Sequence, residues 1–192
     1  MCRCIGPRSV FWREQPVDSM SSFSAYVPVG DQRFRERFGL DFEQFAVGQK
    51  FKHRPGLTLS QQDGRDECLD TLNQQMLHFD EQFAAHGEWK KCLMDSTLTT
   101  RVVLGMTWKT FAKRVQLLGF DEITLPKPTF GGDTLYAESE ILEHANHVDT
   151  PRAGRIKVRT HGINQRGEIV AVLVWDALIA RTGHDDFTRL NY

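Results

Sequence analysis

The chain beyond Gly119 reads as a succession of extended segments, and this stretch limits the fold more than any other part of the sequence. The segments are FDEITL, DTLYAESEILEH, RIKVRTHGI and EIVAVLVWDALIAR, with Pro, Gly or Asn residues between them. Segments of this kind are typical of strands. The stretch from Asn164 to Gly167 predicts a hairpin turn between the last two, because glycine can take the positive φ that such loops need.

The last segment predicts a strand that is covered on both faces. Apolar residues occupy both sets of alternating positions from Ile169 to Trp175. Since successive side chains of a strand point to opposite faces, both faces should be covered. We expect one face to meet a helix and the other to meet a subunit.

The middle of the chain predicts two short helical pieces on either side of a connection. Ser60 followed by Asp63 resembles a helix N-cap with an acidic first turn, so a helix should cover about residues 61–72. Asp80 then offers a cap for a brief helical turn. His78 therefore falls on the connection between the two pieces.

Residues 97–113, TLTTRVVLGMTWKTFAK, predict a long buried helix. Apolar residues from Leu98 to Phe111 broadly follow one helical face, and no proline interrupts the pattern. Gly105 in the middle costs about 1 kcal/mol against alanine, which favours the close passage of another backbone, such as a sheet. A simply tolerated glycine explains it equally well.

Helices first and antiparallel strands afterwards describe an α+β domain in which a curved sheet wraps a central helix. A sheet of this size around one helix leaves apolar surface and an open edge. Two copies are therefore expected to pair, so the sequence predicts a homodimer or a higher homo-oligomer.

Composition is that of an ordinary globular domain and argues against polyanionic partners. With 24 basic and 25 acidic side chains among 192 residues, there is no basic field for nucleic acid, although a local pocket could still bind phosphates. No stretch is apolar enough to span a membrane and no secretion signal is evident, so we expect a cytoplasmic protein. The four cysteines are expected to be reduced thiols, and Cys2 and Cys4 would hold a metal only with ligands from elsewhere.

We divide the chain into an N-terminal extension or arm over residues 1–35, one domain over 36–183 and a C-terminal tail over 184–192. The first part has scattered aromatics and prolines and no sustained helical or strand period. Met20 could be the natural start, but an arm that lies over a partner subunit would look the same in sequence.

An ordered set of motifs over about residues 40–182 carries a family resemblance. The motifs are FEQFAVG at 42–48, NQQMLHFD at 73–80, DST at 95–97 and FGGDTLYAE at 130–138. Together they resemble the MaoC-like enoyl-CoA hydratase/dehydratase family, which has the hot-dog fold, a sheet wrapped around a long helix. Within it, the chain is similar to the branch that acts on branched dicarboxylyl-CoA thioesters such as mesaconyl-CoA or itaconyl-CoA.

The resemblance implies a pair, Asp-x-x-x-x-His, that holds the water added to the substrate. The matching residues are Asn73 and His78, so the histidine is kept and the aspartate is not. Asparagine can orient water but cannot accept a proton at neutral pH, which leaves proton transfer to His78. Asp70 and Asp80 are weaker candidates for the missing carboxylate. On this basis Asn73→Asp is expected to keep or raise turnover.

The resemblance also implies a backbone donor for the thioester oxygen at the N-terminus of the long helix. The matching residue is Ser96, between Asp95 and Thr97, where free N–H groups and the helix dipole favour an anion. We take Asp95 and Thr97 as substrate-binding candidates, and a helix cap at Asp95 would be compatible with that role. The family often has glycine where Ser96 stands, but a backbone amide needs no particular side chain.

Two arginines could bind a substrate carboxylate or a coenzyme A phosphate through bidentate contacts, Arg65 and Arg101. Solvated arginines are commoner, which is the plain alternative for both. The histidines other than His78 stand at no metal-ligand spacing that we would trust, so no metal site is predicted.

The sequence thus favours a hydro-lyase that adds water to, or removes it from, an enoyl-CoA. His78 would move protons, Asn73 would place water and the amide of Ser96 would stabilise the enolate. No metal or redox cofactor is required, since coenzyme A is part of the substrate. A hot-dog acyl-CoA thioesterase and a non-catalytic acyl-CoA binding subunit remain as alternatives, because fold alone does not separate them.

Overall fold

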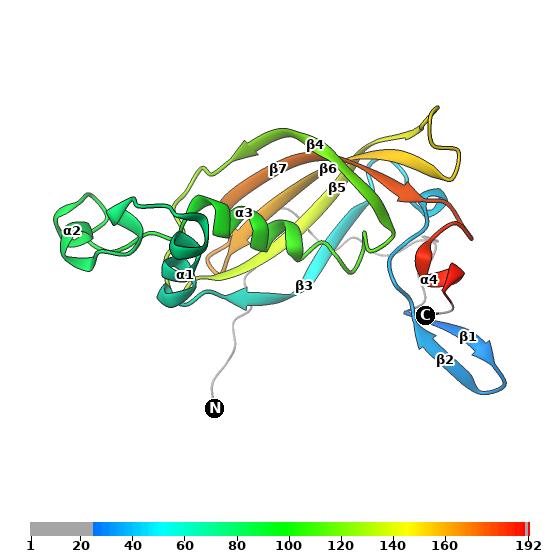
Figure 1. Ribbon diagram of the computed structural model, residues 1–192, viewed down its shortest axis with the longest axis horizontal. Coiled ribbons are helices and arrows are strands. Elements are labelled where there is room, and N and C mark those ends of the chain that lie inside the picture. The colour runs from blue at the N-terminus through cyan, green and yellow to red at the C-terminus, as the bar shows by residue number, and fades with distance from the viewer. Residues whose placement is uncertain (1–24, 191) are drawn as a thin grey trace.

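The computed structural model describes residues 25–190 and 192, and its main body is a five-stranded antiparallel sheet. In spatial order the strands are β3 (Lys50–Thr58), β5 (Thr134–Asn146), β6 (Ala153–Asn164), β7 (Ile169–Ala180) and β4 (Arg114–Thr124). The sheet curves around one helix, α3 (Ser96–Gly105), which lies across its concave face (Figure 1). The predicted α+β architecture is confirmed.

Three short helical elements form a lobe that projects from one end of the sheet (Figure 1). They are α1 (Gln61–Thr71), the single 3-10 turn η2 (Met76–His78) and α2 (Glu81–His86). Helix α1 begins where the sequence predicts, because the Ser60 side chain accepts a hydrogen bond from the Asp63 amide and Asp63 bonds back to the Ser60 amide. The lobe borders the N-terminal end of α3, which places His78 near that end.

Helix α3 is shorter than predicted, and its glycine has a different role. It ends at Gly105, where the Thr107 hydroxyl bonds the Leu104 carbonyl at 2.6 Å and competes with the next helical turn. A Cβ on Gly105 would meet nothing within 4 Å, so the expectation of a close backbone there is wrong. The close approach occurs on the sheet instead, since a Cβ on Gly162 would lie 2.5 Å from Val103.

The core lies between α3 and the sheet and includes a buried polar link. Phe111 and Trp175 pack edge to face with ring centroids 5.2 Å apart, and both are almost fully buried. The Trp175 indole N–H donates to the Thr160 hydroxyl at 3.0 Å, which satisfies its one polar atom. Residues at both alternating positions of β7 are buried, as the pattern of its apolar residues predicts.

The regions outside the predicted domain contain small elements of their own. A hairpin of β1 (Tyr26–Gly30) and β2 (Arg33–Glu36) forms the end of the predicted arm and reaches the first residue of the predicted domain, although the arm sequence shows no strand period. The 3-10 turn η1 (Phe42–Gln44) follows inside the predicted domain, and the predicted tail contains the short helix α4 (Asp186–Arg189). Residues 1–24, including Met20, Cys2 and Cys4, lie outside the described part of the chain.

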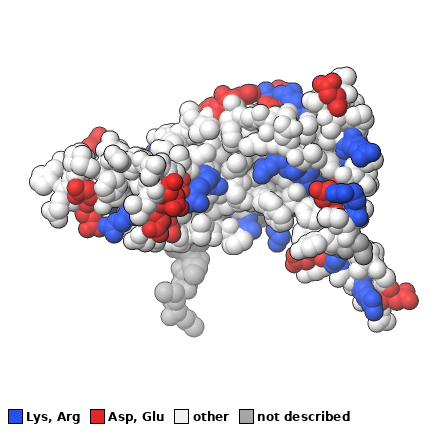
Figure 2. Space-filling model, in the orientation of Figure 1, with Lys and Arg blue, Asp and Glu red and all other residues white. Residues whose placement is uncertain are grey.

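The surface carries charges of both signs. On the face shown in Figure 2, acidic and basic side chains are interspersed over the lobe, the sheet and the hairpin, with wide uncharged areas between them. In the described part of the chain, no helix is both long and apolar enough to cross a bilayer.

Candidate active site

His78 is held at the end of η2 by one of its two ring nitrogens. Its Nδ1 lies 3.2 Å from the Leu93 carbonyl oxygen, which can only accept, so Nδ1 must carry the proton of this bond. The start of the η2 turn is capped by the Gln75 side chain, which accepts a hydrogen bond from the Leu77 amide. In the neutral imidazole Nε2 is then the basic nitrogen, and no partner for it occurs among the described residues.

The N-terminus of α3 presents a free backbone donor. Asp95 is the N-cap, and its carboxylate accepts a hydrogen bond from the Thr97 amide at 2.7 Å. The Ser96 amide at the first helical position has no acceptor within the described residues. Free amides at this position, together with the helix dipole, stabilise an oxyanion.

His78 and Ser96 line one cavity of about 350 Å³, which we call the His78 cavity. Its remaining lining residues are Trp89, Leu93, Met94, Thr99, Leu125, Pro126, Lys127, Pro128 and Thr129. The far wall is held against the start of α3 because the Met94 amide donates to the Thr129 carbonyl at 2.8 Å. The base and the oxyanion donor inferred from the sequence therefore share one space.

Asn73 lies elsewhere, with both ends of its side-chain amide occupied. Its Nδ2 donates to Asp95 Oδ2 at 2.5 Å, and its Oδ1 accepts from the Gln75 amide at 3.0 Å. It does not line the His78 cavity. Its contact with Asp95 links the loop that carries His78 to the start of α3, so here Asn73 acts as a structural bridge.

The Asp95 carboxylate is buried and remains ionised. Burial would raise its pKa, but hydrogen bonds from Thr97 and Asn73 and the charge of His78 outweigh burial, so the pKa is lowered. The neighbouring Cys68 thiol is buried beside it, and burial followed by the Asp95 charge raises the thiol pKa. Asp95 therefore serves as an anchoring anion rather than as a proton acceptor.

A second buried carboxylate, Glu67 on α1, completes this network. It accepts a hydrogen bond from the Thr97 hydroxyl at 2.7 Å and forms an ion pair with Arg101, whose Nε lies 2.6 Å from Oε2. The Thr97 hydroxyl also lies 2.7 Å from Asp95 Oδ1, so it stands between two carboxylates. Thr97 and Arg101 are thus committed to joining α1 to α3, and the part of Arg101 that could meet a ligand is its exposed end.

Arg65 and Asn73 line a different, mostly apolar hollow of about 420 Å³, the α1 groove. The other residues along it are Gln62, Cys68, Leu69, Leu72, Gln74 and Phe79. Arg65 pairs with Glu81 of α2. Of the predicted site residues, His78 and Ser96 therefore line one hollow and Arg65 and Asn73 line another, while Asp95, Thr97 and Arg101 line neither of the two.

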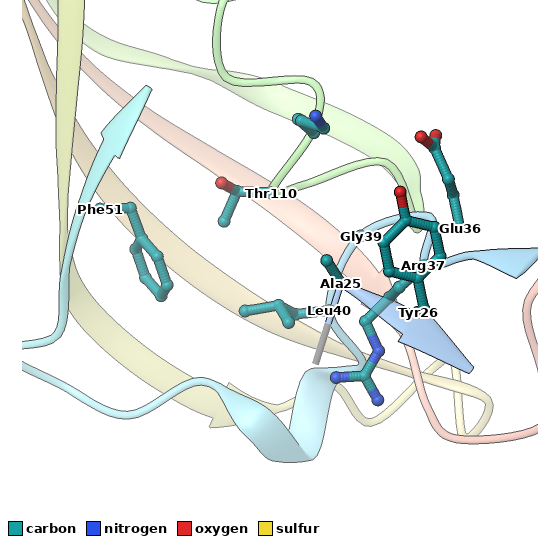
Figure 3. A pocket seen from close by; sticks show the side chains of 9 residues that line it. Ala25, Tyr26, Glu36, Arg37, Gly39, Leu40, Phe51 and Thr110 are labelled. Carbon is teal, nitrogen blue, oxygen red and sulfur yellow. The ribbon is translucent and has the colours of Figure 1, made fainter. Parts of the chain in front are cut away.

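A third hollow, of about 290 Å³, lies at the base of the N-terminal hairpin (Figure 3). Tyr26, Arg37, Phe51 and Thr110 are among its walls, and it contains none of the predicted site residues. Of the three hollows, the His78 cavity alone combines a basic nitrogen with a helix N-terminus.

Sequence reasoning missed Glu67, Cys68 and Thr129. Glu67 and Cys68 face α3 from the middle of α1, where a charged residue reads as a solvated position. Thr129 follows the PKP stretch before a strand and carries no motif of its own. A buried polar residue gives no signal until its partners are known, and these partners are distant in sequence.

Comparison with known proteins shows which sequences this chain resembles. A family model described as mesaconyl-CoA hydratase matches residues 19–181. A mesaconyl-CoA hydratase of Cereibacter sphaeroides is 30% identical over 138 residues, which are 69% of this chain and 38% of that protein. A beta-methylmalyl-CoA dehydratase of Chloroflexus aurantiacus is 22% identical over 125 residues, 65% of this chain and 36% of that protein. The chain thus spans less than half the length of these relatives.

Solved structures agree on the fold. A putative MaoC domain dehydratase from Chloroflexus aurantiacus superposes with a TM-score of 0.71 at 19% identity, over 75% of this chain and 45% of that one. A conserved protein of Mycobacterium tuberculosis, described as having a double hotdog fold, gives 0.66 at 22% identity over 79% of this chain and 49% of that one. The predicted hot-dog fold is confirmed, and the chain corresponds to about half of each of these proteins.

Proposed function

Because this chain belongs to the mesaconyl-CoA hydratase family, we propose that it catalyses the reversible addition of water to an enoyl-CoA thioester. The observation that carries the proposal is the shared cavity of His78 and Ser96, with the basic nitrogen of one and the free amide of the other in a single space. A hydration needs these two groups, a proton carrier and an oxyanion donor.

Each group has a defined part in the reaction. Nε2 of His78 takes a proton from water while the water oxygen bonds to the β-carbon. The electrons of the double bond move toward the thioester carbonyl, whose oxygen becomes an enolate that the Ser96 amide stabilises. The imidazolium then returns the proton to the α-carbon on the same face, which completes a syn addition. Dehydration is the same path reversed.

We assign the substrate to the branched dicarboxylyl-CoA class, of which mesaconyl-CoA and itaconyl-CoA are examples. The names of the relatives support mesaconyl-CoA and its hydrated product, and the ordered motifs of the sequence support the same branch. The size of the cavity, about 350 Å³, suits a short acyl chain.

We also propose that two copies of the chain form the active unit. Strand β4 at the end of the sheet exposes the apolar side chains of Val115, Leu118, Phe120 and Ile123, which fits pairing along this edge. Sedimentation equilibrium at assay concentration should give twice the 22.0 kDa chain mass, and a monomer would contradict the proposal.

The test of the function follows two signals on the same substrates. Crotonyl-CoA, mesaconyl-CoA and itaconyl-CoA are incubated with the protein while enoyl absorbance and free thiol are recorded. We expect enoyl absorbance to fall without thiol release, and fastest with a dicarboxylyl substrate. Thiol release without hydration would establish a thioesterase instead, and no change with any substrate would favour a binding subunit.

A further inference from the structure

Thr129 has an unusual position in the wall of the His78 cavity. The residue is 3% exposed, and its hydroxyl oxygen is buried with no hydrogen-bond partner. Among the buried polar side-chain atoms without partners in residues 25–190, it is the one that belongs to this cavity. The protein itself therefore gives this hydroxyl nothing to bind.

The backbone around Thr129 is held by hydrogen bonds to neighbouring segments. Its carbonyl accepts the Met94 amide at 2.8 Å, and the next residue, Phe130, pairs with Leu93 in an isolated bridge and donates its amide to Asp133 at 3.0 Å. Leu93 is also the acceptor for His78. The segment that holds the imidazole thus also fixes Thr129 opposite the start of α3.

Other buried threonines of the chain are satisfied by the protein. Thr160 bonds to Ser139 at 2.8 Å and to Trp175 at 3.0 Å, and Thr99, in the same cavity as Thr129, donates to the Asp95 carbonyl at 3.4 Å. An unpaired hydroxyl is costly to bury, and most such groups have a partner. A group left unpaired in the wall of a ligand cavity is best explained by a partner that arrives with the ligand.

The surroundings of Thr129 indicate the charge of that partner. The nearby wall is apolar, with Leu125, Pro126 and Pro128, while Lys127 adds a half-exposed ammonium group to the lining. Lys127 is balanced by Glu168 at 2.7 Å. A cavity whose lining includes both a hydroxyl donor and a lysine suits an anionic group, and charge-assisted hydrogen bonds to such a group are the stronger ones.

We propose that Thr129 is a specificity-determining residue whose hydroxyl donates a hydrogen bond to the carboxylate at the far end of the substrate's acyl chain. This inference rests on the proposed function, and it attributes to Thr129 the enzyme's preference for dicarboxylyl thioesters over simple enoyl thioesters. Thr129 has no part in proton transfer, which His78 performs.

The test measures binding of unreactive, saturated thioesters, so that it does not depend on turnover. Methylsuccinyl-CoA carries the second carboxylate and butyryl-CoA lacks it. Thr129→Val should weaken binding of methylsuccinyl-CoA about tenfold to a hundredfold, as for a hydrogen bond to a charged group, and change butyryl-CoA by less than twofold. Thr129→Ser, which keeps a hydroxyl, should retain the preference.

Thr160→Val provides a matched control, because it removes a buried hydroxyl that already has partners outside the cavity. It should lower the melting temperature and leave the ratio of the two dissociation constants unchanged. Thr129→Val should not lower the melting temperature, since the hydroxyl that it removes is unpaired in the free protein.

Three outcomes overturn the inference. Equal weakening of both thioesters by Thr129→Val would mean that the hydroxyl contacts the shared part of the ligand. Unchanged binding of both, with wild-type binding intact, would refute the contact while the proposed function stands. If the wild-type protein binds neither thioester, the proposed function fails and the inference fails with it.

Discussion

Helix α3 has a histidine near each end, and the two imidazoles lie in different surroundings. Just beyond its C-terminal end, His53 of β3 is 3% exposed, with Nε2 2.8 Å from the Ser139 hydroxyl and Nδ1 3.3 Å from the Thr110 hydroxyl. At its N-terminal end, His78 uses Nδ1 alone and lines a cavity. The first ring has both nitrogens occupied and the second has one free.

The charges around the two rings differ as well. Burial, and then the positive charge of Arg54, lowers the pKa of His53 to about 4, so this ring stays neutral through the physiological range. His78 instead lies within electrostatic reach of the buried Asp95 carboxylate. A histidine becomes a proton carrier when a second group fixes one nitrogen and an anion can stabilise its charged form, and His53 has neither a free nitrogen nor an anion.

The largest expected effect tests this contrast directly. His78→Ala should lower kcat by about a hundredfold to ten-thousandfold, the usual contribution of general acid–base catalysis, while its circular dichroism spectrum stays that of the wild type. His53→Gln, which keeps an amide donor and acceptor toward Ser139 and Thr110, should leave kcat within a few fold. A wild-type rate in His78→Ala would remove the proposed proton carrier.

The second effect concerns the donor that faces His78. Ser96 is the first residue of α3, where proline is well tolerated, and Asp95 before it has ψ of 143°, the extended conformation that a residue before proline prefers. Ser96→Pro therefore removes one N–H with little harm to the helix. We expect kcat to fall about a hundredfold to a thousandfold.

Ser96→Ala is the control for this change, because it removes the hydroxyl and keeps the amide. Its kcat should remain within a few fold of the wild type, and both variants should melt at similar temperatures. If Ser96→Ala loses as much activity as Ser96→Pro, the side chain is the important group and the oxyanion assignment is wrong.

The fold could be predicted from the sequence because its determinants are local. The helix cap at Ser60 and the strand that begins at Ile169, with apolar residues on both faces, each depend on neighbouring residues. Both are found where expected. The end of α3 could not be predicted, since it depends on the Thr107 hydroxyl bonding Leu104. A side-chain hydroxyl that takes a helix carbonyl in this way ends the helix without changing the helical spacing of the apolar residues, so the spacing gives no warning of the end.

The positions of the candidate site could be proposed from the sequence, but the contacts of its residues could not. His78 and Ser96 could be matched to family motifs, and the structure brings them to one cavity. The matching of Asn73 to a water-binding aspartate gave no indication that its side chain would bond Asp95, 22 residues later. Glu67 is marked by its burial beside Thr97 and Arg101, and Thr129 by a buried hydroxyl that has no partner, and only the packed structure reveals either.

The third effect is on stability and concerns His53. Its pKa is lowered in the folded protein to about 4 from an ordinary value of 6.5, so between these values the unfolded chain takes up a proton that the folded chain refuses. The free energy of unfolding should therefore fall as pH drops from about 6.5 to 4, by up to about 3 kcal/mol for this one group, and change no further below that range.

Urea unfolding at several pH values, with and without His53→Gln, measures this contribution. The variant cannot titrate, so the difference between the two proteins should shrink steadily as pH falls from 6.5 to 4. A difference that stays constant over that window would mean that His53 is protonated in the folded state, and the contrast with His78 would lose its electrostatic basis.

The smallest effect comes from Asn73→Asp, for which the structure changes the expectation. The motif alone favours kept or raised turnover. In the structure, a carboxylate at this position would replace the donor to Asp95 Oδ2 with a second negative charge at hydrogen-bond distance. The variant should lose about 1–3 kcal/mol of unfolding free energy at neutral pH, the usual cost of breaking such a buried bond.

The sign of its pH dependence separates this explanation from a catalytic one. The new carboxylate at position 73 and that of Asp95 would be close enough to share a proton. The pair would therefore titrate at higher pH in the folded chain than in the unfolded chain. Both proteins carry His53 and lose the same stability through it, so the stability deficit of the variant relative to the wild type should shrink as pH falls toward 4. Unfolding curves at pH 7.5 and 4.5 decide the matter, because an Asn73→Asp protein as stable as the wild type at both values would show that residue 73 is free to turn toward His78.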